Sequence, residues 1–263
     1  MMRALRTAAS GMYAQQLQID SISNNLANVN TTGYKKSKVE FQDLIYQTIQ
    51  ATHSVRGLGT TVPAELQIGH GVKPVAIEKN FSQGSPSQTG NMLDMSIEGE
   101  GFFQIMRPDA SIAYTRNGNF SVSPDGRIVN SDGYLLEPEI IIPQDALEIT
   151  IDREGYVFAK MWGDTESTEV GQIELARFTN PTGLRAMGQT LFKETEASGI
   201  RILANPGQEG FGEVHQGYLE ASNVQVVEEM VDMIIAQRAY ELSSKAIKTA
   251  DSMMQEANNL KRG

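Results

Sequence analysis

The side chains able to do acid–base, metal or nucleophilic chemistry are few in this sequence and widely separated. Its three histidines, His53, His70 and His215, have no carboxylate or second histidine at metal-ligand spacing, so we expect them to be surface or structural residues. The chain has no cysteine, which excludes thiolate zinc sites, iron–sulfur clusters, a cysteine nucleophile and disulfide bonds. It also lacks a G-x-S-x-G motif and a phosphate-binding loop.

Two short patterns near residue 100 resemble chemical sites. Gly99-Glu100-Gly101 begins like a dinucleotide fingerprint, but the third glycine is missing and strand-forming residues follow, which favours a β-turn. Glu98 and Glu100 resemble a pair of catalytic carboxylates, because residues i and i+2 of a strand share a face. A solvated strand edge is the simpler explanation. We therefore predict no catalytic residue, no cofactor and no metal site.

Composition limits the remaining functions. The 263 residues are 40% hydrophobic and 21% charged, which suits one large domain or two modest ones and excludes a wholly disordered chain. A net charge of −10 argues against nucleic acid or anionic lipid as the main partner. No run of about 18 apolar residues is available to span a bilayer. The basic start lacks the apolar region of a cleaved signal peptide, so any export is expected to use another route.

Helix breakers and charge divide the chain into ends and a centre. All nine prolines lie between Pro63 and Pro206. Glycine is also scarce near both ends of the chain, with two before residue 42 and one after residue 221. Residues 42–221 carry a net charge of −12, whereas residues 1–41 carry +3 and residues 222–263 carry −1. This distribution predicts helical termini around an acidic, β-rich centre.

Residues 5–29 contain a heptad pattern typical of helix–helix packing. Seven of the eight positions that alternate in steps of three and four are apolar: Leu5, Ala8, Met12, Gln15, Ile19, Ile22, Leu26 and Val29. Gly11 lies within this pattern and is tolerable if a neighbouring backbone approaches closely there. Asn28 and Gly33 belong to a turn-forming run that ends the helix.

The C-terminal segment carries two apolar stripes. The first advances by about 3.6 residues per step and includes Val224, Val227, Val231, Ile235, Ala239 and Leu242. The second follows a heptad grid through Val226, Met230, Met233, Tyr240, Ile247 and Met254. A surface helix of a monomer needs only one apolar face, so we expect this helix to be contacted from more than one side. Ser222 or Asn223 is placed to cap the helix, and Glu228 and Glu229 suit its first turn.

The centre shows the signals of short strands and tight turns. Alternation at residues 93–97 and 147–151 predicts strands, and Asn117-Gly118, Asp125-Gly126 and Asp132-Gly133 predict hairpins or turns. No stretch resembles a long crossover helix, which argues against parallel βαβ units. Residues 46–71 are rich in threonine, glycine and glutamine without a persistent period, and their composition predicts a loop or linker.

Two runs at opposite ends of the chain resemble the signature of the flagellar rod and hook axial proteins. They are SNNLANVNTTGYK at residues 23–35 and GYLEASNVQVVEEMVDMIIAQRAYE at residues 217–241. The central motifs SIEGEGFFQI (96–105) and YTRNGNF (114–120) are similar to that family as well. Residues 44–72 favour the distal-rod branch over hook and proximal-rod proteins. The resemblance covers essentially the whole chain and is loose only over residues 160–210.

The resemblance implies an α+β fold in three parts. Terminal helices, residues 1–45 plus 215–263, would pack as a coiled-coil-like inner layer and polymerise. A β-rich connector would comprise 46–90 plus 195–214, and a central all-β domain, 91–194, would face outward. The implied function is a structural subunit of the distal rod, which forms a hollow drive shaft that transmits torque to the hook and conducts exported subunits. A hook or proximal-rod protein, or a secreted β-domain enzyme oligomerised by its termini, remains an alternative.

The implied partners are other copies of the chain, proximal-rod and hook proteins, the rings around the rod and the type III export apparatus, with no nucleic acid. The implied location is the basal body in the periplasmic space, reached without a cleaved signal peptide. The predicted subunit-interface residues come from both ends and from the 46–71 segment: Leu5, Met12, Ile19, Ile22, Asn24, Asn25, Leu26, Asn28, Gly33, Val55, Leu58, Val62, Asn223, Val224, Val227, Met230, Val231, Ile235, Arg238, Tyr240 and Leu242.

Overall fold

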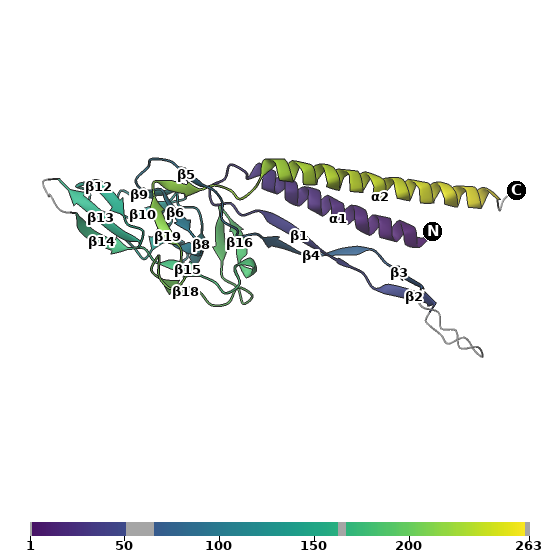
Figure 1. Ribbon diagram of the computed structural model, residues 1–263, viewed down its shortest axis with the longest axis horizontal. Coiled ribbons are helices and arrows are strands. Elements are labelled where there is room, and N and C mark those ends of the chain that lie inside the picture. The colour runs from purple at the N-terminus through teal and green to yellow at the C-terminus, as the bar shows by residue number, and fades with distance from the viewer. Residues whose placement is uncertain (1, 51–65, 163–166, 261–263) are drawn as a thin grey trace. The chain divides into compact units, whose positions relative to one another are not determined.

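The computed structural model describes residues 2–50, 66–162 and 167–260, in which two α-helices stand at the ends of a series of β-strands (Figure 1). Tertiary contacts divide the chain into two compact units. Unit 1 comprises residues 1–26, 37–78 and 226–263, and unit 2 comprises residues 27–36 and 79–225. The α+β class expected from the sequence is confirmed.

The two long helices of unit 1 are antiparallel. They are α1 (Met2–Ala27) and α2 (Val226–Leu260), and the start of α1 and the end of α2 lie at the same end of the pair (Figure 1). Asn25 of α1 donates a hydrogen bond to Glu229 of α2, and Gly11 lies against Ser243 two heptads away on each helix. This register matches the predicted helix–helix packing. Neither helix, over its described residues, is long and apolar enough to cross a membrane.

Unit 1 also contains two β-ribbons. Strand β1 (Ser37–Asp43) pairs with β4 (Val72–Lys79), and β2 (Tyr46–Gln50) pairs antiparallel with β3 (Leu66–Gly69). The expectation of a loop over residues 46–71 is therefore wrong at both of its ends. Strand pairing stabilises these polar, weakly patterned segments, and a period-2 search cannot detect pairing that does not bury one face.

Unit 2 is built from short strands. Its largest sheet has nine strands in the described residues: β16 (Arg185–Gly188), β17 (Leu191–Lys193), β8 (Ile112–Thr115), β7 (Phe102–Met106), β11 (Leu135–Glu137), β10 (Ile128–Asn130) and β9 (Phe120–Val122), with β15 (Leu175–Arg177) and β18 (Ile202–Ala204) joined through β7. Three smaller sheets complete it: β12 (Ala146–Ile151), β13 (Tyr156–Met161) and β14 (Thr168–Gln172); β6 (Met95–Glu98) with β19 (Glu213–Gln216); and β5 (Pro86–Gln88) with β20 (Tyr218–Glu220). The 3₁₀ helix η1 (Pro181–Gly183) precedes β16.

The turns join these strands largely as the sequence indicates. Gly126 and Gly133 both have a φ of +81° in the tight turns between β9, β10 and β11, a conformation that favours glycine. Asn117-Gly118 connects β8 to β9 without forming a hairpin, because β8 pairs with β7 and β17 instead. The carbonyl of Gly118 accepts a hydrogen bond from the Met95 amide.

The hydrophobic core of the described residues lies in unit 2. One cluster includes the fully buried Phe103, Ile105, Phe120 and Ile128, and a second forms around Phe102, Tyr114, Phe178 and Phe192. Aromatic rings contact edge to face in both clusters, for example Phe103 and Phe120 with centroids 5.3 Å apart. Unit 2 thus has a core of its own.

Candidate functional site

One face of α2 packs on α1 through small residues. The positions of α2 that are not exposed form a seam along one side of the helix: Glu229, Met233, Ala236, Ala239, Ser243, Ser244, Ile247, Ala250 and Met254. Met233, Ile247 and Met254 belong to the predicted second stripe, and Ala239 belongs to the first. Ala236 and Ala250 are buried but belong to neither predicted stripe, because alanine carries a weaker apolar signal than the large residues that define the stripes. Small residues at alternate positions let the helices approach closely.

The other face of α2 is apolar and exposed. Val227, Val231, Ile235 and Leu242, which we call the α2 stripe, are 75%, 50%, 60% and 68% exposed. Elsewhere around α2, the predicted interface residues Met230 and Tyr240 are 52% and 39% exposed, and Arg238, three residues after Ile235, is exposed as well. Such a contiguous face on a helix whose other face is already packed is typical of an interaction surface.

The predicted interface residues of α1 have a different environment. Leu5, Met12, Ile19 and Leu26 are half-buried and Ile22 is buried, so the seam contacts its own chain. Asn25 is also buried: its side chain accepts from the Ser37 amide and donates to Glu229, with N–O distances of 2.8 and 3.1 Å. Asn24 alone of this group is exposed.

The remaining predicted interface residues are dispersed. Gly33 and Val224 are buried, and Asn28 is half-buried in the turn after α1, where it accepts hydrogen bonds from Thr31. Gly33 adopts a φ of +68° and packs against the Asn117 backbone, where a Cβ atom would lie 2.6 Å from the amide nitrogen. Val55, Leu58 and Val62 lie outside the described residues.

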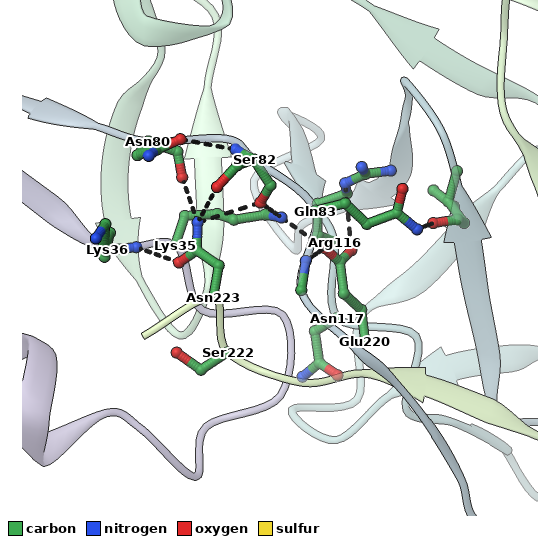
Figure 2. A network of polar contacts seen from close by, with 12 residues as sticks. Lys35, Lys36, Asn80, Ser82, Gln83, Arg116, Asn117, Glu220, Ser222 and Asn223 are labelled. Carbon is green, nitrogen blue, oxygen red and sulfur yellow. Dashed lines mark hydrogen bonds and ion pairs between the residues drawn. The ribbon is translucent and has the colours of Figure 1, made fainter. Parts of the chain in front are cut away.

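Asn223 is not the helix cap that the sequence suggests. Its side-chain oxygen accepts a hydrogen bond from the Lys36 amide at 2.8 Å, and its amide group donates to the carbonyls of Asn80 and Ser82 (Figure 2). The helix begins only at Val226. Ser222 instead accepts from the Val224 amide at 3.3 Å, in a turn before the helix. Glu228 and Glu229 do lie in the first turn, as predicted.

A group of three buried charges, which we call the charged network, lies next to Asn223 in unit 2. Lys35 Nζ lies 2.5 Å from Glu220 Oε1 and donates to the Ser82 carbonyl at 2.7 Å (Figure 2). Arg116 Nε lies 3.4 Å from the second oxygen of Glu220, and its Nη2 donates to the Gly99 carbonyl at 2.6 Å. The three residues are at most 4% exposed.

Burial dominates the electrostatics of this network. It lowers the pKa of Lys35, while the Glu220 carboxylate opposes that shift and the Arg116 charge adds to it. It also lowers the pKa of Arg116, against the attraction of Glu220 and Glu100. Two buried cations therefore share one buried carboxylate. Removing Glu220 would leave both cations uncompensated in a medium of low polarity, which is strongly destabilising.

The charged network joins all four sequence motifs. Lys35 ends the first run, Glu220 lies in the last, Arg116 comes from YTRNGNF and Gly99 from SIEGEGFFQI. This network was not predicted from the sequence. Single charged residues within motifs rich in glycine and asparagine were the pattern that could have indicated it. Within unit 2, these contacts link segments from near both ends of the chain to segments from its centre.

The histidines and glutamates considered for catalysis lie outside the charged network. His215 Nε2 lies 2.8 Å from Glu98 Oε2 on paired strands, and the side chains of Glu98 and Glu100 are 71% and 75% exposed. Gly99 and Gly101 have φ values of +112° and +145° in the bend between β6 and β7, a conformation that favours glycine. His53 lies outside the described residues. Within those residues, no group of three or more histidine, aspartate or glutamate side chains could hold a metal ion.

Three family profiles match the sequence. The flagella basal body rod protein profile matches residues 5–35, the flagellar hook protein FlgE/F/G D1 domain profile matches residues 96–159, and the flagellar basal body rod FlgEFG protein C-terminal profile matches residues 215–260. These segments contain the α1 seam, the Arg116 motif and the α2 stripe.

Full-length relatives agree with the profiles. The chain is 51% identical to the flagellar basal-body rod protein FlgG of Borreliella burgdorferi, over 100% of both chains. It is 51% identical to the FlgG protein of Caulobacter vibrioides over 99% of this chain and 100% of that one, and 40% identical to that of Bacillus subtilis over 100% of both.

Proposed function

The chain belongs to the flagellar basal-body rod protein family, and on that premise we propose that it is a structural subunit of the distal rod. Copies of the chain polymerise into a hollow shaft that transmits torque to the hook and conducts exported subunits. The proposal assigns the chain no catalytic activity and no cofactor. The relatives carry the name of a rod protein along their entire length, which favours this function over a hook protein or an oligomeric enzyme.

The α2 stripe is the observation that carries the proposal. Its four residues are each 50–75% exposed although α2 already packs on α1 through its opposite seam. Burying what remains exposed contributes roughly 4–8 kcal/mol per subunit before the costs of association. A lone subunit gains none of this, whereas a polymer that surrounds α2 with other copies gains it at every subunit.

We extend this to the parts of the polymer. The terminal helices, in the discontinuous segment 1–45 plus 215–263, form the inner layer; the connector, 46–90 plus 195–214, surrounds it; and residues 91–194 face outward. Proximal-rod and hook proteins contact the two ends of the shaft, and the rod-bushing rings surround it. The chain reaches the periplasmic space through the flagellar type III export apparatus without a cleaved signal peptide.

A single carboxylate on the α2 stripe tests the proposal. Ile235→Glu would place a charge within an apolar contact between subunits, which costs several kcal/mol, so we expect at least tenfold fewer rods in a bacterium that depends on this chain. Gln237→Glu adds the same charge to an exposed position of α2 outside the stripe and should assemble normally. Electron microscopy of isolated basal bodies counts rods, and circular dichroism of the purified chain confirms folding. Normal rods with folded Ile235→Glu chain would contradict the proposal.

A further inference from the structure

A cavity of about 350 Å³ opens beside the charged network in unit 2. Its walls include Phe81, Phe102 and Phe178, whose rings contact edge to face with centroids 5.4 and 5.9 Å apart. Arg116 and Arg177 also line it. We call it the phenylalanine pocket. Its volume is at the lower end of the range for ligand sites and suits one or two side chains rather than a large cofactor.

The charges around the phenylalanine pocket do not balance. Three cations, Lys35, Arg116 and Arg177, face two carboxylates, Glu220 and Glu100. Within the described residues, Arg116 Nη1 is buried without a hydrogen-bond partner, although the guanidinium lies 5.7 Å from the centre of the Phe102 ring. The contact of Arg116 with the network's carboxylate is a single long one, Nε to Glu220 Oε2 at 3.4 Å. An additional carboxylate in the pocket would supply the missing negative charge.

Apolar walls beside unmatched positive charge select an apolar side chain flanked by acidic ones. Unit 2 itself carries such a group at the start of β12, residues 145–148, which we call the acidic corner. Leu147 is 59% exposed, and Asp145 and Glu148 on either side are exposed and form no ion pair within the described part of the chain. The exposed leucine of the acidic corner suits the apolar walls of the phenylalanine pocket, and its two carboxylates suit the pocket's positive charge.

The pocket and the corner lie at opposite ends of unit 2. The pocket includes Pro181 of η1, next to β16, whereas the sheet of β12, β13 and β14 is at the far end of this unit (Figure 1). Within one copy they do not meet. A contact between the tail of one unit and the head of the next is heterologous, and heterologous contacts that do not close a ring generate open helical polymers.

We propose that the acidic corner of one copy inserts Leu147 into the phenylalanine pocket of a neighbouring copy, with Asp145 and Glu148 facing Arg177 and Arg116. This inference rests on the proposed function, because it requires a homopolymer. It adds a specific contact between unit 2 domains to the helix contacts proposed above.

Disulfide trapping tests the contact directly, because the natural chain has no cysteine and any disulfide must come from introduced residues. Thr179→Cys in the pocket lining combined with Leu147→Cys should give a ladder of covalent oligomers when assembled rods are oxidised and separated without reductant. The matched control combines Thr179→Cys with Ile141→Cys, which is 55% exposed against 59% for Leu147. A ladder confined to the Leu147 pair supports the contact; equal ladders, or none, overturn it.

A charge exchange tests the electrostatics. Arg177→Glu and Glu148→Arg should each lower the number of rods at least threefold, and the double variant should restore it. A double variant no better than the poorer single variant overturns the pairing. The unaltered chain is assayed in parallel: absence of rods with it overturns the proposed function and this inference together, whereas normal rods without selective cross-linking overturn this inference alone.

Discussion

Unit 1 and unit 2 use apolar residues in opposite ways. Unit 2 buries its large side chains in two clusters, and residues such as Phe103, Phe120 and Ile105 are completely inaccessible. Unit 1 leaves Val227, Ile235 and other large residues more than half exposed on α2. One chain therefore contains a part that buries its large apolar side chains on folding and a part that leaves them exposed.

The difference follows from what each unit has available to bury. Short strands with turns between them let unit 2 close around phenylalanine and isoleucine. The helix pair of unit 1 meets through Gly11, Ser243, Ala236 and Ala250, which bury little area, and through the polar pair Asn25 and Glu229. Helix pairs with so thin a seam gain most of their stability from further packing.

Truncating apolar side chains in the two units gives the largest expected contrast. Phe103→Ala should lower the free energy of unfolding of the purified monomer by about 3–5 kcal/mol, because it removes a completely buried ring. Ile235→Ala should change it by less than about 0.5 kcal/mol. Urea denaturation followed by circular dichroism measures both. Similar losses for the two variants would show that the monomer already covers the α2 stripe.

The charged network offers a second way to sharpen the comparison. Glu220→Gln leaves Lys35 and Arg116 buried without an anion and should destabilise unit 2 by about 3 kcal/mol. Glu154→Gln removes an exposed carboxylate of the same unit and serves as the control. The same denaturation assay applies. If the Glu220 variant keeps the stability of the control, the network does not hold unit 2 together.

In unit 1 the largest polar contribution should come from Asn25. Asn25→Ala removes its bonds to Ser37 and Glu229 and leaves a buried carboxylate without that donor, at a cost of about 2 kcal/mol. The exposed amide of Gln16 on α1 provides the control variant Gln16→Ala. Hydrogen exchange of α1 and α2 in the monomer is the measurement. Unchanged exchange in the Asn25 variant would mean that the helices separate in solution.

The smallest expected effect is a gain. Gly11→Ala should stabilise α1 by about 1 kcal/mol, because alanine is the better helix former and its Cβ would lie 3.5 Å from Ser243 Oγ, an ordinary contact. Gly84→Ala in unit 2 should instead destabilise, since a methyl group there collides with the Ala221 carbonyl oxygen. Thermal unfolding separates the two. A loss of stability in the Gly11 variant would indicate a tighter helix contact than the structure shows.

Periodic features were predictable from the sequence, and long-range polar features were not. The α1 seam, the helical ends and the strand at Ala146–Ile151 follow from apolar spacing. The α2 seam was found only in part, because Ala236 and Ala250 carry no strong apolar signal. The charged network joins residues 185 positions apart, and no local pattern states that Lys35 meets Glu220. Asn223 was taken for a cap because its partners, Lys36 and Asn80, are equally remote.

That separation has a consequence for the order of folding. The ion pair between Lys35 and Glu220 closes a long loop, and contacts so distant in sequence form late and slowly. A chain that emerges gradually, with its N-terminus first, keeps Lys35 and Arg116 without their carboxylate until Glu220 has appeared. Unit 2 therefore cannot form its charged network before residue 220 has emerged, which is after more than four fifths of the chain.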